Sequence, residues 1–453
     1  MAEAGLENAF KEWGNASEKP WVELQYLKPE RGEDDDERTF AELSRDEKIR
    51  RLAEDFEIRL ARRVLARAPG PSRADVMKAA EQVVPEVQAE EDERIREALK
   101  GLGVDWSRGE VGAPVSLAVP SAGELVLVPG EKAEVRFTVE NRGQTPVFRV
   151  WGRTDSDNPL LRNLDFAFGR LDPGQKRSWS AEVEVPKSAP RRWDTVTLSL
   201  RCEGAEEAGS GALAARVKGT PRPKFAYAYR LTDENPADPA LSGDGRLQQG
   251  ELARLVLEVT NRGRAETGKV EVNIRGEEKE QLYLEKARYR FEAVDPGETV
   301  EAPMAFRVVK AEEDGRIRLG VSVTDRDYGV FFSDNLTFWQ DKPYPAAQRR
   351  EPPRFELEPL PLHTDAGRIV IEVTAVDDEA VKDVYAYRGR DKIRYVRNRS
   401  GGARLPVRLE VDLEEGSNRI VVVARDDKEI VASRTFFVYR TRPGDPGTEL
   451  TMK

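Results

Sequence analysis

Oxygen-bearing side chains gather in one short stretch of the sequence, between residues 233 and 251. The five of interest are Asp233, Asn235, Asp238, Asp244 and Glu251. Carboxylate and amide oxygens at alternate positions, glycines for a tight turn and a downstream glutamate are what a calcium loop requires. The spacing departs from the helix–loop–helix calcium pattern, and prolines interrupt it. The stretch therefore predicts either a Ca²⁺ loop or an acidic surface loop whose Asp and Asn side chains cap their own turns.

The residues that most often carry catalysis are scarce. The chain has one histidine, His363, and one cysteine, Cys202. These numbers exclude an internal disulfide and a conventional Cys/His zinc site. The two residues fall in different predicted domains, which argues against a Cys–His dyad. No glycine-rich turn presents a serine followed by a lysine on a helix, so we predict no enzyme activity in this chain.

A second group of carboxylates lies in the last predicted domain. Asp377, Asp378 and Asp426 are expected near one end of it, and turn capping is the favoured role. A hydrolase that uses Asp377 and Asp378 as a pair is disfavoured, because adjacent side chains on a strand point to opposite faces.

The composition bounds the class of protein. A chain of 453 residues should hold three or four domains. Its net charge of −10 argues against nucleic acid, which requires a basic surface. It has no apolar run long enough to span a membrane. The first residues, MAEAGLENAFKEWGN, lack the basic and apolar regions of a secretory signal.

The chain contains a repeat of about 120 residues. The stretch GEKAEVRFTVENRG at 130–143 returns as GELARLVLEVTNRG at 250–263, and LDPGQ at 171–175 returns as VDPGE at 294–298. Between the Gly-Glu and Asn-Arg-Gly markers apolar and polar residues alternate, which predicts a strand with one buried face. Strands separated by such turns are typical of an immunoglobulin-like antiparallel β-sandwich. The Gly-rich stretch 204–211 is expected to be a surface loop.

An α-helical hairpin is expected before the first sandwich. Ser44 and Glu47 form a capping box, apolar residues follow at helical spacing, and Pro85 should kink or break the second helix. Its apolar stripe is too narrow for an independent domain, so it must pack on a sandwich, a partner or another domain. A coiled-coil dimer is the weaker alternative, because the prolines interrupt any heptad.

The predicted fold is mainly β, with three tandem immunoglobulin-like sandwiches after the hairpin. The expected segments are an acidic linker with a candidate edge strand at 1–40, the helical segment at 41–112, sandwiches at 113–220 and 221–341, a proline-rich linker at 342–353, a third sandwich at 354–440 and a tail at 441–453.

Several stretches together resemble a known family. They are ELQYLKPERGEDDDE, LAEDFEIRLARRVL, LGVDW, TVENRGQTPVFRVWGRTDSDNP, FAFGRLDPGQKRSW, PRPKFAYAYRLTDE and SGDGRLQQGE. They look like the C-terminal, non-peptidase region of large proteobacterial carboxy-terminal processing (tail-specific) serine proteases, over residues 22–340. In that family a PDZ-bearing peptidase precedes an acidic linker, a helical segment and β-sandwich modules. The third domain resembles bacterial immunoglobulin-like modules through AVDDEAVKDV and GSNRIVVVARD.

The resemblance implies a protein-binding accessory region. The family's serine and lysine lie in its peptidase domain, so no catalytic residue is carried over to this chain. The implied partner is a peptidase domain or its substrate in the periplasm or cell envelope, and the chain would then be a split-gene product or a fragment. The alternative is a stand-alone adhesion or carbohydrate-binding protein, for which exposed aromatic residues would be needed. The candidates are Trp106, Trp151, Trp179, Trp193, Trp339 and Tyr385.

Overall fold

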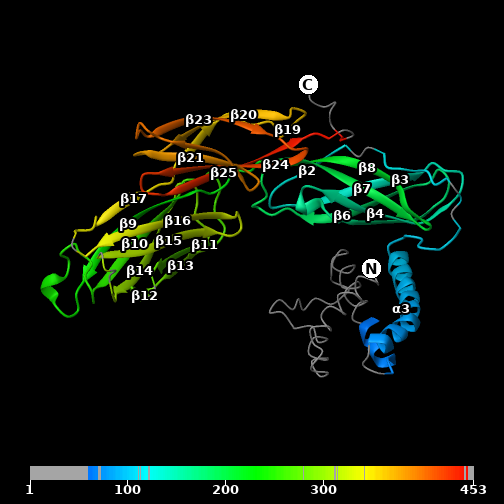
Figure 1. Cartoon of the computed structure of the whole chain (residues 1–453), viewed down its shortest axis with the longest axis horizontal. Coiled ribbons are helices and arrows are strands. Elements are labelled where there is room, and N and C mark those ends of the chain that lie inside the picture. The colour runs from blue at the N-terminus through cyan, green and yellow to red at the C-terminus, as the bar shows by residue number, and fades with distance from the viewer. Residues whose placement is uncertain are drawn as a thin grey trace.

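The computed structural model describes residues 60–69, 73–110, 112, 114–120, 123–278, 280–310, 313, 315–340, 342–442 and 445–446. Two helices precede three β-sandwiches, which confirms the predicted fold class (Figure 1). The acidic linker and candidate edge strand at 1–40 and the capping box at Ser44 and Glu47 lie outside these residues. No helix in the described part of the chain is long and apolar enough to cross a membrane.

The helical hairpin comprises residues 60–67 and α3 (Arg73–Gly101). The two helices share a small buried cluster that includes Leu60, Val64 and Val83. Helix α3 continues through Pro85, so the predicted break does not occur there. It ends at Gly101, and the next turn brings Val104 into the core of the first sandwich.

The first sandwich has a three-stranded and a five-stranded sheet. The smaller sheet has the order β1 (Leu117–Ala118), β3 (Lys132–Asn141), β6 (Lys176–Glu184). The larger has the order β2 (Glu124–Leu127), β8 (Ala205–Val217), β7 (Arg192–Cys202), β4 (Val147–Ser156), β5 (Asp165–Leu171), with a 3-10 turn at Pro159–Leu161. Most of the stretch 204–211, expected to be a surface loop, belongs to β8. There Ser210 pairs with Ser199, and a glycine lets the backbone pass close to Leu117.

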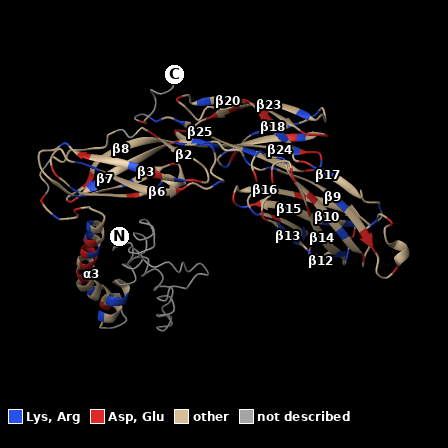
Figure 2. Ribbon diagram, turned by 180° about the vertical axis from the view of Figure 1, so that it is seen from behind, with Lys and Arg blue, Asp and Glu red and all other residues tan. Residues whose placement is uncertain are grey.

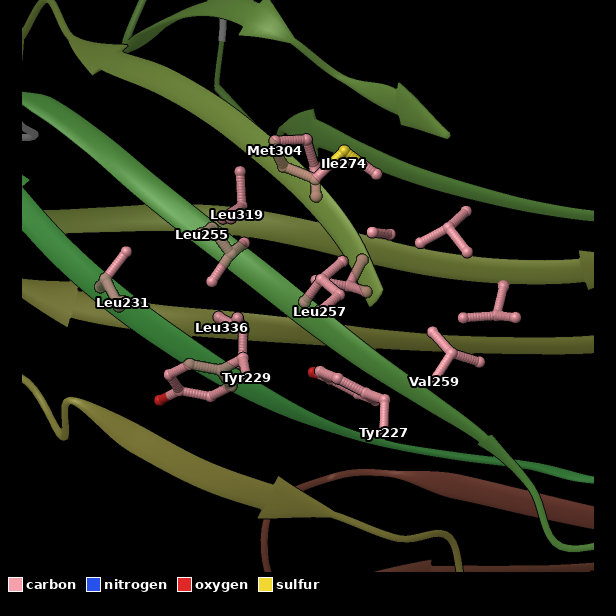
Figure 3. Close-up of a cluster of buried hydrophobic side chains, with 14 of the residues drawn as sticks. Tyr227, Tyr229, Leu231, Leu255, Leu257, Val259, Ile274, Met304, Leu319 and Leu336 are labelled. Atoms are coloured by element: carbon pink, nitrogen blue, oxygen red, sulfur yellow. The ribbon is translucent and has the colours of Figure 1, made fainter. Parts of the chain in front are cut away.

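The second sandwich has a five-stranded and a four-stranded sheet. The first has the order β12 (Leu282–Lys286), β14 (Thr299–Val308), β10 (Leu252–Asn261), β9 (Phe225–Glu234), β17 (Ala347–Arg350). The second has the order β13 (Arg288–Phe291), β11 (Val270–Gly276), β15 (Arg316–Asp325), β16 (Val330–Trp339), and a 3-10 turn lies at Pro239–Leu241. Figure 3 shows Tyr227, Tyr229 and Leu257 packed in its core.

Part of the segment expected to be a linker is a strand. Residues 347–350 form β17, which pairs antiparallel with β9 through Ala347 and Arg230. The prolines stand on either side of this short strand, where a missing backbone donor does not interrupt the ladder. The second sandwich therefore extends into the segment 342–353.

The two repeats use their sequence markers in the same way. Gly130 N donates to Val185 O at 2.7 Å, and Gly250 N donates to Val308 O at 2.7 Å. The Asp-Pro-Gly turns meet the asparagine of each Asn-Arg-Gly triplet, because Gly174 N donates to the carbonyl of Asn141 and Gly297 N donates to that of Asn261. The matched segments thus occupy equivalent strands, β3 and β10.

The side chains of these asparagines close the repeat unit. Asn141 Nδ2 donates to the carbonyls of Thr145 and Leu171, at 2.9 Å each. Asn261 Nδ2 donates to the carbonyls of Ala265 and Val294, at 2.8 and 3.0 Å. Both asparagines are fully buried, and each Oδ1 accepts the N–H of the triplet's glycine. The triplet is therefore an internal brace, in addition to being a turn.

The third sandwich also has a three-stranded and a five-stranded sheet. The smaller has the order β18 (Arg354–Leu357), β20 (Arg368–Val376), β23 (Arg404–Asp412). The larger has the order β19 (His363–Thr364), β25 (Val431–Arg440), β24 (Gly416–Asp426), β21 (Val381–Arg388), β22 (Asp391–Arg397). The alternation predicted around Ile371 and Leu409 places both side chains in its core.

The third sandwich contacts both of the others. In Figure 1 it lies along the second sandwich, and its strands β24 and β25 reach the first. Ile430, in the turn between these strands, is fully buried in the core of the second sandwich. Tyr439, at the far end of β25, packs against the first sandwich. Charges of both signs alternate along the strands (Figure 2), so the surface of the assembly is mixed rather than uniformly acidic.

Candidate functional site

The most elaborate arrangement of side chains is the junction between the first and third sandwiches. Trp193 on β7 is 4% exposed and packs edge-on against Tyr439, with ring centroids 5.0 Å apart. The chain's one histidine, His363, also lies against this indole, with the ring centroids 4.9 Å apart. Because these rings come from two domains, burying them fixes the third sandwich against the first.

Polar contacts surround the rings of this junction. Asp157 accepts the backbone N–H of Ser417 at 3.0 Å and a guanidinium N–H of Arg442 at 3.1 Å. Arg192 donates to Asp194 and to Ser417 Oγ, and its guanidinium lies 4.5 Å from the ring centre of Phe437. These hydrogen bonds satisfy polar groups that the junction removes from water.

Burial dominates the charge state of Asp194. This carboxyl is fully buried, and desolvation raises its pKa to about 6 although Arg192 favours the charged form. A strongly shifted carboxyl in a cleft would be a functional candidate. Here both oxygens accept hydrogen bonds from Arg192, so the carboxylate orients a residue of the junction.

A buried ion pair marks the junction between the second and third sandwiches. Arg350 on β17 donates two hydrogen bonds to Asp334 on β16, at 2.7 and 2.9 Å, and both residues are 6% exposed. The hydroxyl of Tyr227 donates to the same carboxylate at 2.7 Å. The pair joins β17 to the opposite sheet, and the charge of Arg350 also acts on Asp426 of the third sandwich.

In the stretch that predicted a calcium loop, each of the five side chains accepts hydrogen bonds from the protein. Asp233 accepts the N–H of Gly243 at 2.6 Å and the hydroxyl of Tyr344. Asp238 accepts the N–H of Ala240, as the N-cap of a short turn. Asp244 accepts from Arg246 N and from Gln248 Nε2.

The remaining two members bind each other. Asn235 Nδ2 donates to Glu251 Oε1 at 3.2 Å, and Asn235 Oδ1 accepts the N–H groups of Ala237 and Asp238. Glu251 Oε2 accepts the N–H of Gln248 at 2.7 Å, and burial raises the pKa of Glu251. The turn-capping alternative accounts for the contacts with backbone N–H groups, and the remaining contacts join side chains of the loop to one another or to Tyr344. Within the part of the chain that the structure describes, the carboxylates of this loop do not converge at the spacing of metal ligands.

Carboxylates do converge at one end of the third sandwich. Oxygens of Asp377, Asp426 and Asp427 lie within 4.8 Å of one another. The sequence indicated Asp377 and Asp426, but the third member is Asp427 and not Asp378. Asp377 Oδ1 accepts the N–H groups of Glu379 and Ala380, and Asp426 Oδ1 accepts that of Ile430 at 2.6 Å. These contacts are the turn capping that the sequence favoured, and burial raises the pKa of Asp426 to about 6.

The residues that usually act as nucleophile and base are apart. His363 stacks on Trp193 in the junction, whereas Cys202 ends β7 and is partly buried. Desolvation raises the pKa of the Cys202 thiol, which disfavours the reactive thiolate. No hydrogen bond joins the two residues in the described structure. His363 and Cys202 therefore do not form a nucleophile–base pair with each other.

Two of the partly exposed candidate rings, Trp151 and Trp339, have cations of the same chain beside them. Trp151 lies between Arg153 and Arg201, 5.9 and 5.3 Å from its ring centre. Lys342 lies 4.4 Å from the ring centre of Trp339. A sugar stacks on a free ring face, so these cations would have to be displaced first. Trp179 and Trp193 are buried, which removes two more candidates for carbohydrate binding.

Comparisons with known proteins show the fold and nothing finer. No family model matches the chain, and no curated protein matches it. Among solved structures, it is similar to the fibronectin(III)-like modules of CbhA from Clostridium thermocellum, with 16% identity over 47% of this chain and 94% of that one and a TM-score of 0.18. It is also similar to extracellular domains 3–5 of Drosophila OTK, with 13% identity over 73% of this chain and 100% of that one and a TM-score of 0.20. The tandem arrangement of immunoglobulin-like sandwiches rests on the strand orders of the three domains described above.

Proposed function

We propose that this chain is a non-catalytic accessory region that presents or positions substrate or partner proteins for a carboxy-terminal processing serine protease in the bacterial envelope. The observation that supports this proposal best is the double packing of the third sandwich. Ile430 is buried in the second sandwich and Tyr439 against the first, so three modules form one braced scaffold. A protein that positions others needs fixed distances between its surfaces, and this packing supplies them.

The inventory of reactive groups agrees with that role. Several of the strongly perturbed groups of the described residues are held in structural pairs: Asp194 by Arg192, Tyr227 and Arg350 by Asp334, and Tyr344 by Asp233. Buried pairs of this kind perturb pKa values without taking part in chemistry. The PDZ-peptidase partner and the envelope location rest on the resemblance of residues 22–340.

Co-purification tests the proposal directly. The full chain, immobilised on beads, is incubated with an envelope extract and with a purified PDZ-peptidase of the family. We expect retention of the peptidase or of its substrate, and no turnover of fluorogenic peptides by the chain alone. Failure to retain either protein would refute the partnership, and turnover by the isolated chain would refute the non-catalytic role.

A further inference from the structure

Strand β22 (Asp391–Arg397) ends the larger sheet of the third sandwich. It pairs with β21 on one side, and the described chain places no strand on its other side. Its backbone N–H and C=O groups on that side are therefore open to another strand. Four of the cations on β22 and its flanking turns are exposed and have no carboxylate within ion-pair distance among the described residues: Arg390, Arg394, Arg397 and Arg399.

Unpaired cations distinguish this edge from the neighbouring edge strand of the facing sheet in the same sandwich. Strand β23 (Arg404–Asp412) also ends a sheet, but its charges are satisfied. Arg404 pairs with Glu356 at 2.5 Å, and Asp412 pairs with Arg368 at 2.5 Å. Pro406 removes one backbone donor from β23. Arg390, Arg394, Arg397 and Arg399 thus place unpaired positive charge where the backbone edge is open.

The side chains of β22 are held in place from its own sheet. The hydroxyl of Tyr395 donates to Asp383 at 3.2 Å, and that carboxylate also accepts hydrogen bonds from Arg425. Lys392 lies 5.0 Å from the ring centre of Tyr385 and 4.8 Å from that of Tyr395. These contacts order the strand before any partner arrives, which lowers the entropic cost of adding one.

Edge strands often carry lysine or arginine to prevent pairing with other edges. Arg394 and Arg397 do repel a second copy of β22, because an antiparallel pair would face like charges across the ladder. The same charges attract an acidic strand, since strand addition takes affinity from main-chain hydrogen bonds and specificity from alternate side chains. In a chain whose net charge is −10, a local cluster of unpaired arginines needs a separate explanation.

We propose that β22 binds an extended acidic segment of another protein by strand addition. The register between β21 and β22 is regular from the pair Asp383/Arg397 to the pair Ala386/Arg394, and the bulge at Tyr387 follows. This regular part of β22 is the edge available for pairing. Carboxylates at alternate positions of the added strand meet Arg394 on one face of the sheet or Arg397 on the other. That the segment belongs to a partner or substrate protein rests on the proposed accessory function; the strand addition itself does not.

Fluorescence anisotropy with the full chain tests this edge. The probe is a labelled peptide of about ten residues that alternates glutamate with valine and threonine. A second peptide replaces glutamate with lysine, and a third keeps glutamate but is N-methylated at alternate residues, which removes backbone donors. The test variant is Arg394→Glu/Arg397→Glu, and the matched control is Arg408→Glu on β23. If the charge-reversed variant does not fold, Arg394→Gln/Arg397→Gln takes its place.

We expect the acidic peptide to bind wild type and the β23 control alike, and the charge-reversed variant at least about tenfold more weakly. The lysine peptide and the N-methylated peptide should bind wild type at least as weakly as the acidic peptide binds the charge-reversed variant. No binding of the acidic peptide, equal binding of the N-methylated peptide or equal binding by the variant would overturn the proposal. Co-purification of the peptidase by the Arg394→Glu/Arg397→Glu variant separates the two claims: unchanged capture overturns the role of this edge and leaves the accessory function standing.

Discussion

Trp193 and Tyr439 lie in different sandwiches, and their ring centroids are 5.0 Å apart at an interplanar angle of 69°. This edge-on contact joins β7 of the first sandwich to the last strand of the third. Because Ile430, in the turn just before the same strand, is buried in the second sandwich, the three modules are braced around β25. Tandem sandwiches joined only by linkers would move independently.

Replacing Trp193 with alanine should release the third sandwich from the first. The change removes the buried ring that contacts both Tyr439 and His363, and the loss of such burial costs about 3–5 kcal/mol. Small-angle scattering should show a larger radius of gyration, and the N–H of Ser417 should exchange faster. Trp151→Ala, on an outer sheet face of the same sandwich, is the control. An unchanged scattering profile for Trp193→Ala would contradict the bracing role.

Replacing Arg350 with methionine should destabilise the second sandwich strongly. Asp334 would keep its buried charge and lose both guanidinium hydrogen bonds, and breaking a buried ion pair costs about 3–5 kcal/mol. The midpoint of urea unfolding measures the loss. Arg349→Met is the matched control, because its exposed pair with Glu351 contributes little. Equal midpoints for the two variants would show that β17 is not held by the ion pair.

Replacing Asp426 with asparagine should stabilise the protein at neutral pH. Burial raises the folded pKa of Asp426 from 3.8 to about 6, so the folded state binds this proton more tightly than the unfolded state. The contribution of this group is therefore favourable at low pH and is lost as the pH rises from about 4 to about 6. Asparagine accepts the same N–H of Ile430 and carries no charge.

Urea unfolding of this variant and wild type across that range gives the measurement. We expect the variant to be more stable by about 1–3 kcal/mol at pH 7, and the difference to vanish near pH 4. Asp365→Asn, at an exposed carboxylate, is the control. A variant that is less stable than wild type at pH 7 would show that the charge of Asp426 is needed there.

The sequence predicts the sandwiches because their markers act locally. Gly130 and Gly250 stand at φ +88° and +92°, a region that glycine adopts without strain, and the strands after them bury alternate residues. The same reasoning misjudges β17, where prolines around Ala347–Arg350 indicated a linker. Whether so short a strand forms is decided by β9 and Asp334, which are remote in sequence.

The contacts between the sandwiches cannot be predicted from the sequence around the residues that make them. Trp193 was a candidate for exposure to a sugar, and nothing near it in the sequence indicates that β25 covers it. The carboxylates of the 233–251 loop illustrate a different limit. Their types suit both an ion and a set of turn caps, and only the positions of Gly243, Gln248 and Tyr344 show which donors each oxygen faces.

Adding calcium tests the loop directly. If its oxygens serve as turn caps, about 5 mM CaCl₂ (about 50-fold to 500-fold above the dissociation constant of a 10⁻⁴–10⁻⁵ M site) should leave the melting temperature unchanged. Asp244→Ala should then lower that temperature equally with and without calcium, because it removes the acceptor for Arg246 N and Gln248 Nε2. A calcium-dependent rise in wild type that Asp244→Ala abolishes would establish the ion site instead. EDTA-treated protein is the reference.

Replacing Asn141 or Asn261 with alanine should destabilise the first and second sandwiches to a similar degree. Each side chain is fully buried and makes two donor bonds and at least one acceptor bond, in the same geometry. Leaving their backbone partners without a hydrogen bond in a buried site costs about 2–4 kcal/mol in total.

Hydrogen exchange separates the two effects, because protection should fall in β3 for one variant and in β10 for the other. Asn398 makes the same bonds to Val381 O and Gly402 O in the third sandwich, although its strand order differs, so Asn398→Ala should loosen the turn after β22. Asn335→Ala, at an exposed position of β16, is the control. If the Asn141 and Asn261 variants were as stable as that control, the shared triplet would be a turn signal only, because the side-chain hydrogen bonds of the asparagine would then contribute nothing to stability.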